Sequence, residues 1–253
     1  MPAVGGVARR ATKINEARAA NEFVLLLDAG DSLMGDQLPA LSTQGRSSVA
    51  IMNHLGYDAL ALGAQDLALG LETVRQRMSE AHFPFLSANA VVAKTGAPLA
   101  QPFVVRTIGA QRVALIGLSD IVTATDILVN DPQAAARAAV AEVAGQADIV
   151  ILLSHAGLAV DQAIAATVPG IDVIVSGGPG APPDPARQPT TGVLIVHADE
   201  AHPGHAGRVL GQQVLDFDAA GQLQQEQIAY VQLGPEIADD AAAAAWANQQ
   251  MSK

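Results

Sequence analysis

The chain has 253 residues and no cysteine, which excludes disulfide bonds, thiolate metal sites and a cysteine nucleophile. Half of the residues are hydrophobic but only 3% are aromatic, so we expect a core built from Ala, Val, Leu and Ile. The net charge of −11 disfavours nucleic acid and anionic membranes as partners. No run of roughly 18 apolar residues predicts membrane insertion, and residues 1–10 lack the apolar segment of a signal peptide.

The first half of the chain alternates helix and strand patterns. Apolar residues three to four apart predict an amphipathic helix over residues 5–20. The run Phe-Val-Leu-Leu-Leu over 23–27 predicts a buried strand that ends at two carboxylates. The pattern then predicts helices over 45–55 and 71–81 and strands over 57–62 and 83–89.

The second half ends in antiparallel strands. Two strands over 103–108 and 112–118 are joined by a short turn, and Asp131-Pro132 is a typical start for a helix that runs to residue 144. The remaining pattern predicts strands over 148–153, 171–175, 193–197, 209–217 and 223–232, and helices over 160–168 and 239–249. Together these elements predict one α/β domain over residues 1–253, with mixed sheets.

Polar or glycine-rich loops follow four of the predicted strands. They contain Asp28 and Asp31, residues 63–66, Ser154-His155 and residues 176–180. Ligands of α/β proteins bind at this end of the strands, and carboxylate and imidazole groups there are natural ligands for a divalent metal. The alternative for each Asp is that it only caps a turn or a helix.

Eight segments in order resemble the N-terminal domain of the 5′-nucleotidase branch of the calcineurin-like metallophosphoesterases. They are GGVARRATKI, LLLDAGDS, GYDALALGAQD, FPFLSAN, VALIGLSD, ILLSHAG, PGIDVIVSGG and LIVHADE, and the resemblance extends from residue 5 to about residue 237. It implies a four-layer αββα metallophosphoesterase sandwich, in which two mixed β-sheets face each other and helices flank them. In that family, two metal ions activate a water for attack on a phosphate ester.

This sequence keeps only part of the ligand set that the resemblance implies. Asp31 matches the aspartate that bridges the two metals, and His155 matches a lone metal histidine. Gln65 stands at the position of the family's catalytic histidine, and Ala64 stands where the family has a ligand asparagine. Ala64 has no ligand atom, and Gln65 cannot exchange a proton near neutral pH. Residues 177–180 replace a Gly-His-x-His motif, and the family's first Asp-x-His motif does not occur before residue 5.

Two ligands cannot enclose even one metal, because four to six donors are usual. The first hypothesis is therefore a 5′-nucleotidase-like domain without ordinary phosphatase activity, which serves as a binding or scaffolding module and needs no cofactor. The second is a metal-dependent phosphoester hydrolase with a remodelled site that uses Asp31, Asp66 and His155. A metal held there would be Zn, Mn or Fe.

A histidine-rich stretch could contribute to such a remodelled site. His197, His202 and His205 lie with two carboxylates within nine positions, and this mixture suits zinc or iron. The alternative is a polar, solvated loop, because the histidines have no regular ligand spacing on one element. His54 and His82 lie on or beside predicted helices and are interpreted as ordinary surface or half-buried residues.

The glycine loop offers one further candidate site. Gly177, Gly178 and Gly180 could present backbone N–H groups to an anion, although a plain turn is the alternative. A phosphorylated small molecule or a protein is thus the expected partner, while the oligomeric state stays open. The resemblance implies a periplasmic or envelope location.

Overall fold

The computed structural model describes residues 5–34, 38–122, 124–178, 186–197 and 207–251. Its helices are α1 (Val7–Ala20), α2 (Leu38–Ser42), α3 (Arg46–Leu55), α4 (Ala64–Leu67), α5 (Leu71–Glu80), α6 (Pro132–Val143), α7 (Leu158–Thr167) and α8 (Ala241–Met251). Its strands are β1 (Leu27–Asp28), β2 (Ala59–Ala61), β3 (Phe85–Leu86), β4 (Ala90–Val92), β5 (Phe103–Ile108), β6 (Gln111–Leu118), β7 (Ile127–Val129), β8 (Ile149–Ser154), β9 (Val173–Ser176), β10 (Ala186–Arg187), β11 (Leu194–His197), β12 (Val209–Phe217) and β13 (Leu223–Gln232).

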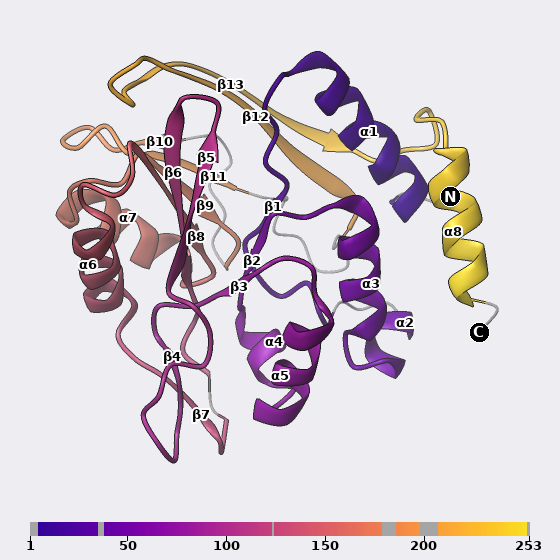
Figure 1. Cartoon of the computed structure of the whole chain (residues 1–253), viewed down its shortest axis with the longest axis horizontal. Helices are drawn as coiled ribbons and strands as arrows, with labels where there is room; N and C mark the ends of the chain where they lie inside the picture. The colour runs from indigo at the N-terminus through magenta and orange to yellow at the C-terminus, as the bar shows by residue number, and fades with distance from the viewer. Residues whose placement is uncertain (1–4, 35–37, 123, 179–185, 198–206, 252–253) are drawn as a thin grey trace.

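Two sheets form the centre of the described structure. The smaller sheet has the order β1-β2-β3 and is parallel throughout. The larger has the order β10-β11-β9-β8-β6-β5, with β6, β8, β9 and β11 parallel and both edge strands antiparallel to their neighbours. Figure 1 shows α6 and α7 on one side of this pair of sheets, and α1, α3 and α5 on the other.

Three buried clusters of apolar side chains separate the four layers. The central cluster joins Ala59 and Leu86 of the smaller sheet to residues of β6, β8, β9 and β11. A second cluster joins Leu60 to the inner faces of α1, α3 and α5. The third joins the other face of the larger sheet to α6 and α7. The predicted αββα architecture is therefore confirmed.

The larger sheet is buried on both faces, as its sequence pattern requires. In β6, Val113 and Leu115 belong to the central cluster, whereas Ala114 and Ile116 face α6 and α7. Successive strand residues point to opposite faces, so a continuous apolar run is needed for a sheet that is covered on both sides. The helix that covers it starts as expected, since the Asp131 side chain accepts a hydrogen bond from Ala134 N–H at 2.7 Å.

Strand β1 is shorter than the strand predicted over residues 23–27. Of the run over 23–27, only the last residue pairs with β2, and the Phe23 side chain is 53% exposed. The Leu26 carbonyl oxygen still accepts Asp58 N–H at 2.8 Å, but the Leu26 N–H donates to the Asp58 side chain at 2.8 Å, so the regular ladder begins only at Leu27. The smaller sheet is also parallel where a mixed sheet was expected. The sequence patterns did not indicate α2, α4, β4, β7 or β10.

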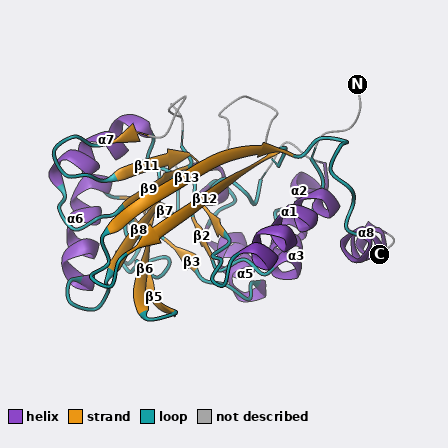
Figure 2. Cartoon of the chain, turned by 90° about the horizontal axis from the view of Figure 1, so that it is seen from above, coloured by secondary structure: helices purple, strands orange, loops and turns teal. Residues whose placement is uncertain are grey.

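The C-terminal elements pack against both halves of the molecule. Strands β12 and β13 form a long hairpin that runs across the sheets between the two sets of helices (Figure 2). Helix α8 lies beside α1 and α3, where Trp246 stacks on His54 with ring centroids 4.2 Å apart. Within the described ranges, none of the helices is long and apolar enough to cross a membrane.

Candidate functional site at the strand ends

The parallel strands bring the predicted site residues to one edge. In the larger sheet, Leu118, Ser154, Ser176 and His197 are register partners along neighbouring strands, so their following loops meet at the carboxyl end. The loop after β1 reaches the same place, because the His155 imidazole lies against Ala29. Asp31 and His155, which lie 124 positions apart in the sequence, are therefore brought together.

Asp31 and His155 bind each other. His155 Nε2 lies 2.9 Å from Asp31 Oδ2, and its Nδ1 lies 2.9 Å from the Ala29 carbonyl oxygen. Oxygen acceptors at both ring nitrogens favour the form in which both nitrogens carry protons, the imidazolium ion. Burial alone would lower the pKa of His155, but the hydrogen bond and charge of Asp31, helped by the Ala29 carbonyl, raise it above its ordinary value.

The second oxygen of Asp31 is also engaged. Oδ1 accepts a hydrogen bond from the backbone N–H of Gln65 at 2.8 Å. Burial tends to raise the pKa of Asp31, but the bond and charge of His155, together with Gln65, hold it below its ordinary value. Asp31 has a φ of 61°, a left-handed conformation that is uncommon for a residue with a side chain. This conformation directs its backbone N–H and its side chain into the same cluster.

Asp66 fastens the two loops of the smaller sheet to each other. Its side chain is fully buried, and its oxygens accept three backbone N–H groups, from Asp31, Leu33 and Gly63, each at 2.9 Å. Burial and the charge of Asp31 raise the pKa of Asp66 to about 7, against the opposing effect of the bonds from Gly63 and Leu33. Asp66 was a candidate ligand of the remodelled site, but its oxygens are occupied by the backbone.

Asp28 is likewise turned inward, which fits the turn-capping alternative. Its carboxylate accepts Gly30 N–H at 2.9 Å and the Ser32 hydroxyl at 2.6 Å. Burial raises the pKa of Asp28, although Ser32 and Gly30 act against the rise. Asp28, Asp31 and Asp66, with His155, form what we call the Asp31–His155 corner, and all three of its carboxylates accept hydrogen bonds from the protein itself.

The glycines of the site allow its parts to approach closely. Gly30 has a φ of 109°, and a Cβ at this position would lie 2.8 Å from His155 Nδ1. A Cβ at Gly63 would lie 2.2 Å from Asp31 Oδ1. Side chains at either position would push the Asp31–His155 pair apart.

Asp161 is a second buried carboxylate near His155, and the sequence patterns did not reveal it. Asp161 of α7 accepts hydrogen bonds from the hydroxyls of Ser154 at 2.5 Å and Ser176 at 2.6 Å. Burial raises the pKa of Asp161 to about 6, against the effect of both hydroxyls. The only sequence signal was a serine at the end of two neighbouring strands. This triad joins α7 to β8 and β9 directly behind His155.

The predicted anion loop is only partly described. The N–H of Gly177 donates to the Ser154 carbonyl at 2.7 Å, so it is not available to an anion. A Cβ at Gly178 would lie 2.6 Å from the His155 carbonyl oxygen, which leaves no room there for a larger side chain. Gly180 lies outside the described residues, and the anion site stays a prediction without its Gly177 donor.

Of the predicted histidine cluster, only His197 lies within the described residues. His197 is buried, its Nε2 lies 3.5 Å from the Gly178 carbonyl oxygen, and its N–H donates to the Tyr230 hydroxyl at 3.3 Å. His202 and His205 lie outside the described residues. The structure thus places His197 beside the loop that packs on His155, and the rest of this prediction is untested.

The described residues do not fit a metal pair. In this arrangement neither ring nitrogen of His155 is directed at a free position, since Nε2 faces Asp31 Oδ2 and Nδ1 faces the Ala29 carbonyl oxygen, and each oxygen of Asp31 already accepts one hydrogen bond, from Gln65 or from His155. Over the described ranges, no group of three or more His, Cys, Asp or Glu side chains is arranged to hold a metal ion. The Gln65 side chain, at the position of the family's catalytic histidine, is exposed.

Comparison with known proteins places this geometry in a family. No protein-family model matches the chain. The 5′-nucleotidase of Bos taurus is 33% identical over 245 residues, which cover 86% of this chain and 42% of that protein. The chain therefore spans less than half the length of this relative.

Two solved structures agree with this. A 5′-nucleotidase precursor from Thermus thermophilus has a TM-score of 0.85 and 30% identity, covering 99% of this chain and 54% of that one. The calcineurin-like phosphoesterase YfkN from Bacillus subtilis has a TM-score of 0.80 at 22% identity, covering 99% of this chain and 89% of that one, and supports the fold alone. The chain therefore belongs to the 5′-nucleotidase family, and it has the fold of the calcineurin-like phosphoesterases.

Proposed function

We propose that this chain is a 5′-nucleotidase-like domain that acts as a binding or scaffolding module and does not hydrolyse phosphate esters through a metal pair. The observation that carries the proposal is the direct bond between Asp31 and His155, the two positions that match family ligands. In this bond the Nε2 atom of His155, whose lone pair a metal would require, is directed at Asp31 instead. A proton on His155 would have to leave before the ring could bind a cation.

The charge balance of the corner supports the same conclusion. Asp28, Asp31 and Asp66 converge on one region, and like charges at close range repel each other. The imidazolium of His155 lies among them and supplies a compensating positive charge. In this proposal the protonated histidine takes over the electrostatic role of a metal, so the loops keep their positions without one.

The partner is proposed as a phosphorylated small molecule or a protein, and the location as the periplasm or cell envelope. Both proposals rest on the family. The relatives are named 5′-nucleotidases, and the Thermus protein is named a precursor. Because the chain spans less than half of the Bos taurus relative, the activity of a whole 5′-nucleotidase is not assigned to it.

The test compares metal content and turnover in the same samples. The protein would be purified with Mn²⁺ or Zn²⁺ present, dialysed, and analysed for bound metal, and then assayed with an aryl phosphate and with AMP. We expect substoichiometric metal, and a rate no higher than that of Asp31→Ala. A binding titration with AMP and with inorganic phosphate in EDTA would show whether either ligand binds without metal.

Two variants separate this proposal from the remodelled hydrolase. His155→Gln keeps a neutral hydrogen-bonding side chain but removes the positive charge, so we expect a loss of stability that added metal does not restore. Asp58→Asn serves as a matched control, because Asp58 accepts a bond from Leu26 N–H outside the cluster. Stoichiometric metal together with turnover that Asp31→Ala abolishes would overturn the proposal in favour of the hydrolase.

A further inference from the structure

The outer edge of β5 is a free strand edge on the described structure. Strand β5 lies at the end of the six-stranded sheet and pairs only with β6. Near Gln101 the two sheets touch, through a bridge to Leu86 and a bond from Ser87 N–H to the Gln101 carbonyl. Beyond that point, none of the described strands pairs with this side of β5. A free edge presents unpaired backbone groups to which an extended chain can bind.

The pairing register identifies which residues face outward. Ile108 and Gln111 flank a two-residue turn, so they form a hydrogen-bonded pair, and such pairs alternate along an antiparallel ladder. The bond from Gly117 N–H to the Pro102 carbonyl fits the same alternation. The residues between these pairs, Phe103, Val105 and Thr107, therefore direct their N–H and C=O groups away from β6.

A groove runs beside this edge. It has a volume of about 620 Å³ and lies between β5 and the segment that leads into β3. The groove is open to solvent on one side, which suits an extended chain better than an enclosed small molecule. Its lining contains no carboxylate, although the chain carries a net charge of −11. The groove is therefore distinct in charge from the average surface of the protein.

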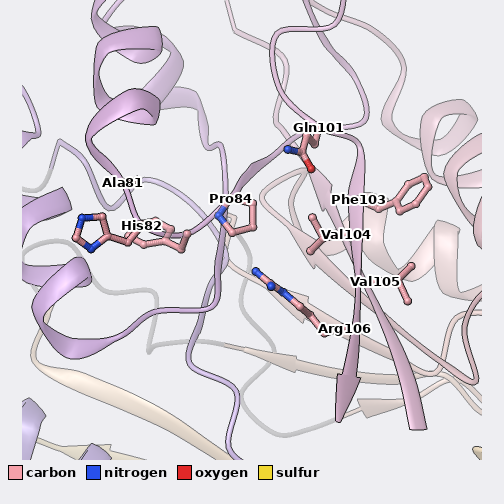
Figure 3. A pocket seen from close by; sticks show the side chains of 9 residues that line it. Ala81, His82, Pro84, Gln101, Phe103, Val104, Val105 and Arg106 are labelled. Carbon is pink, nitrogen blue, oxygen red and sulfur yellow. The ribbon is translucent and has the colours of Figure 1, made fainter.

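Arg106 supplies the positive charge of this groove. Its side chain extends from β5 toward Pro84, whereas Phe103 and Val105 lie on the opposite side of the strand (Figure 3). Arg106 is exposed, and no ion pair or side-chain hydrogen bond joins it to any described residue. An unpaired guanidinium beside open backbone groups is suited to bind a carboxylate side chain of a paired strand.

We propose that β5 and this groove bind an extended, acidic segment of a partner protein, which adds to the sheet as a seventh strand next to β5. The backbone of the segment pairs with Phe103, Val105 and Thr107, and one of its carboxylates binds Arg106. This surface lies apart from the Asp31–His155 corner. The inference therefore goes beyond the proposed function and does not depend on whether that corner binds a metal.

The test uses a short labelled peptide in which valine alternates with glutamate, and fluorescence anisotropy as the measurement. We expect saturable binding that falls about tenfold or more in Arg106→Glu, because a charge-assisted contact becomes a repulsion. A peptide with lysine in place of glutamate should bind more tightly to Arg106→Glu than to the wild type. Arg75→Glu on α5 is the matched control, since it changes the net charge equally on an exposed surface outside the groove.

Two further measurements test the backbone pairing. Val105→Pro removes an outward N–H without breaking a bond to β6, so we expect binding to be lost while the thermal melt stays close to that of the wild type. An N-methylated form of the peptide should also fail to bind to the unaltered protein, whatever the proline does to folding.

Three outcomes would overturn the proposal. The first is that the acidic peptide shows no saturable binding. The second is an equal loss of affinity in Arg106→Glu and Arg75→Glu, which would indicate unspecific attraction between charges. The third is full binding by the N-methylated peptide, which would exclude strand addition. Analytical sedimentation of the chain without peptide tests whether a second copy of the chain occupies the edge. Dimers that Arg106→Glu or Val105→Pro dissociates would show that a second copy occupies the edge, and not an acidic partner.

Discussion

Asp66 is the residue whose replacement tests the structure of the site most directly. It accepts the N–H groups of Asp31 and Leu33 from the loop after β1, and that of Gly63 from the turn after β2. In Asp66→Asn, one oxygen becomes an NH₂ group that can only donate. At least one of the three N–H groups then faces another donor in a buried position.

The expected cost follows from these contacts. A buried donor left without an acceptor costs about 1–3 kcal/mol, and a bond to a charged group contributes about 1.5–3 kcal/mol. If the amide oxygen keeps two of the three N–H groups, Asp66→Asn should lower the free energy of unfolding by about 2–3 kcal/mol. Asp66→Ala leaves all three N–H groups unpaired, and the loss should reach about 3–6 kcal/mol.

The assay is urea unfolding at pH 8, where Asp66 is ionised because its pKa is about 7. Amide hydrogen exchange gives the local readout, since protection should fall at Asp31, Leu33 and Gly63 before it falls elsewhere. Asp126→Asn is the matched control, because Asp126 accepts a single N–H, that of Leu71, at 2.9 Å. That control should lose about 1 kcal/mol.

The reasoning fails if Asp66→Asn loses no more stability than Asp126→Asn. It also fails if the stability falls but the three amides keep their protection. The first result would mean that the bonds contribute little, and the second that the loss arises outside the loops. Either would remove the basis for regarding the corner as a self-contained structural unit.

Three further predictions concern the layers around the site. Burial raises the pKa of Asp161 to about 6, whereas an Asp in the unfolded chain has a pKa near 3.9. Between about pH 4 and pH 6, therefore, only the folded state holds this proton. The free energy of unfolding should fall as the pH rises through this window, by up to about 3 kcal/mol. The difference in unfolding free energy between wild type and Asp161→Asn should therefore change across that window, and a constant difference would contradict the expectation. Leu152→Ala, at a fully buried position between β8 and the helices, should cost about 2–5 kcal/mol in urea unfolding, and a loss below 1 kcal/mol would mean that the site collapses without a cavity. Gly63→Ala would place a Cβ 2.2 Å from Asp31 Oδ1, so the NMR signals of the His155 ring protons should shift, and an unchanged spectrum would contradict the close packing.

Most of the fold could be predicted because it depends on residue periodicity. The longer helices and the long strands followed from the sequence pattern, and the start of α6 followed from Asp131 and Pro132. The short strands could not be found in this way. Strand β1 pairs over two residues, and its limit is set by the side chain of Asp58, which is 32 positions away from Leu26. A local pattern carries no information about such a contact.

The site residues were identified more completely than their roles. Asp31, Asp66 and His155 stood out because they follow strands, and the register of the sheets does bring them to one edge. Which atoms bond to which depends on backbone direction, as in the left-handed Asp31 and the three N–H groups around Asp66. Asp161 was missed for a related reason, because its two serine partners lie on different strands.

The Asp31–His155 pair has a structural role that does not depend on catalysis. Three carboxylates meet at this corner, and each takes its hydrogen bonds from the protein itself. Loss of His155 would leave these charges without the imidazolium between them, and loss of Asp31 would leave that imidazolium without its acid partner. Breaking either half of a buried ion pair is costly, because the remaining charge has no compensation. An ion pair of this kind stabilises the loops whether or not a metal binds, so the presence of Asp31 and His155 does not by itself indicate a phosphoesterase activity.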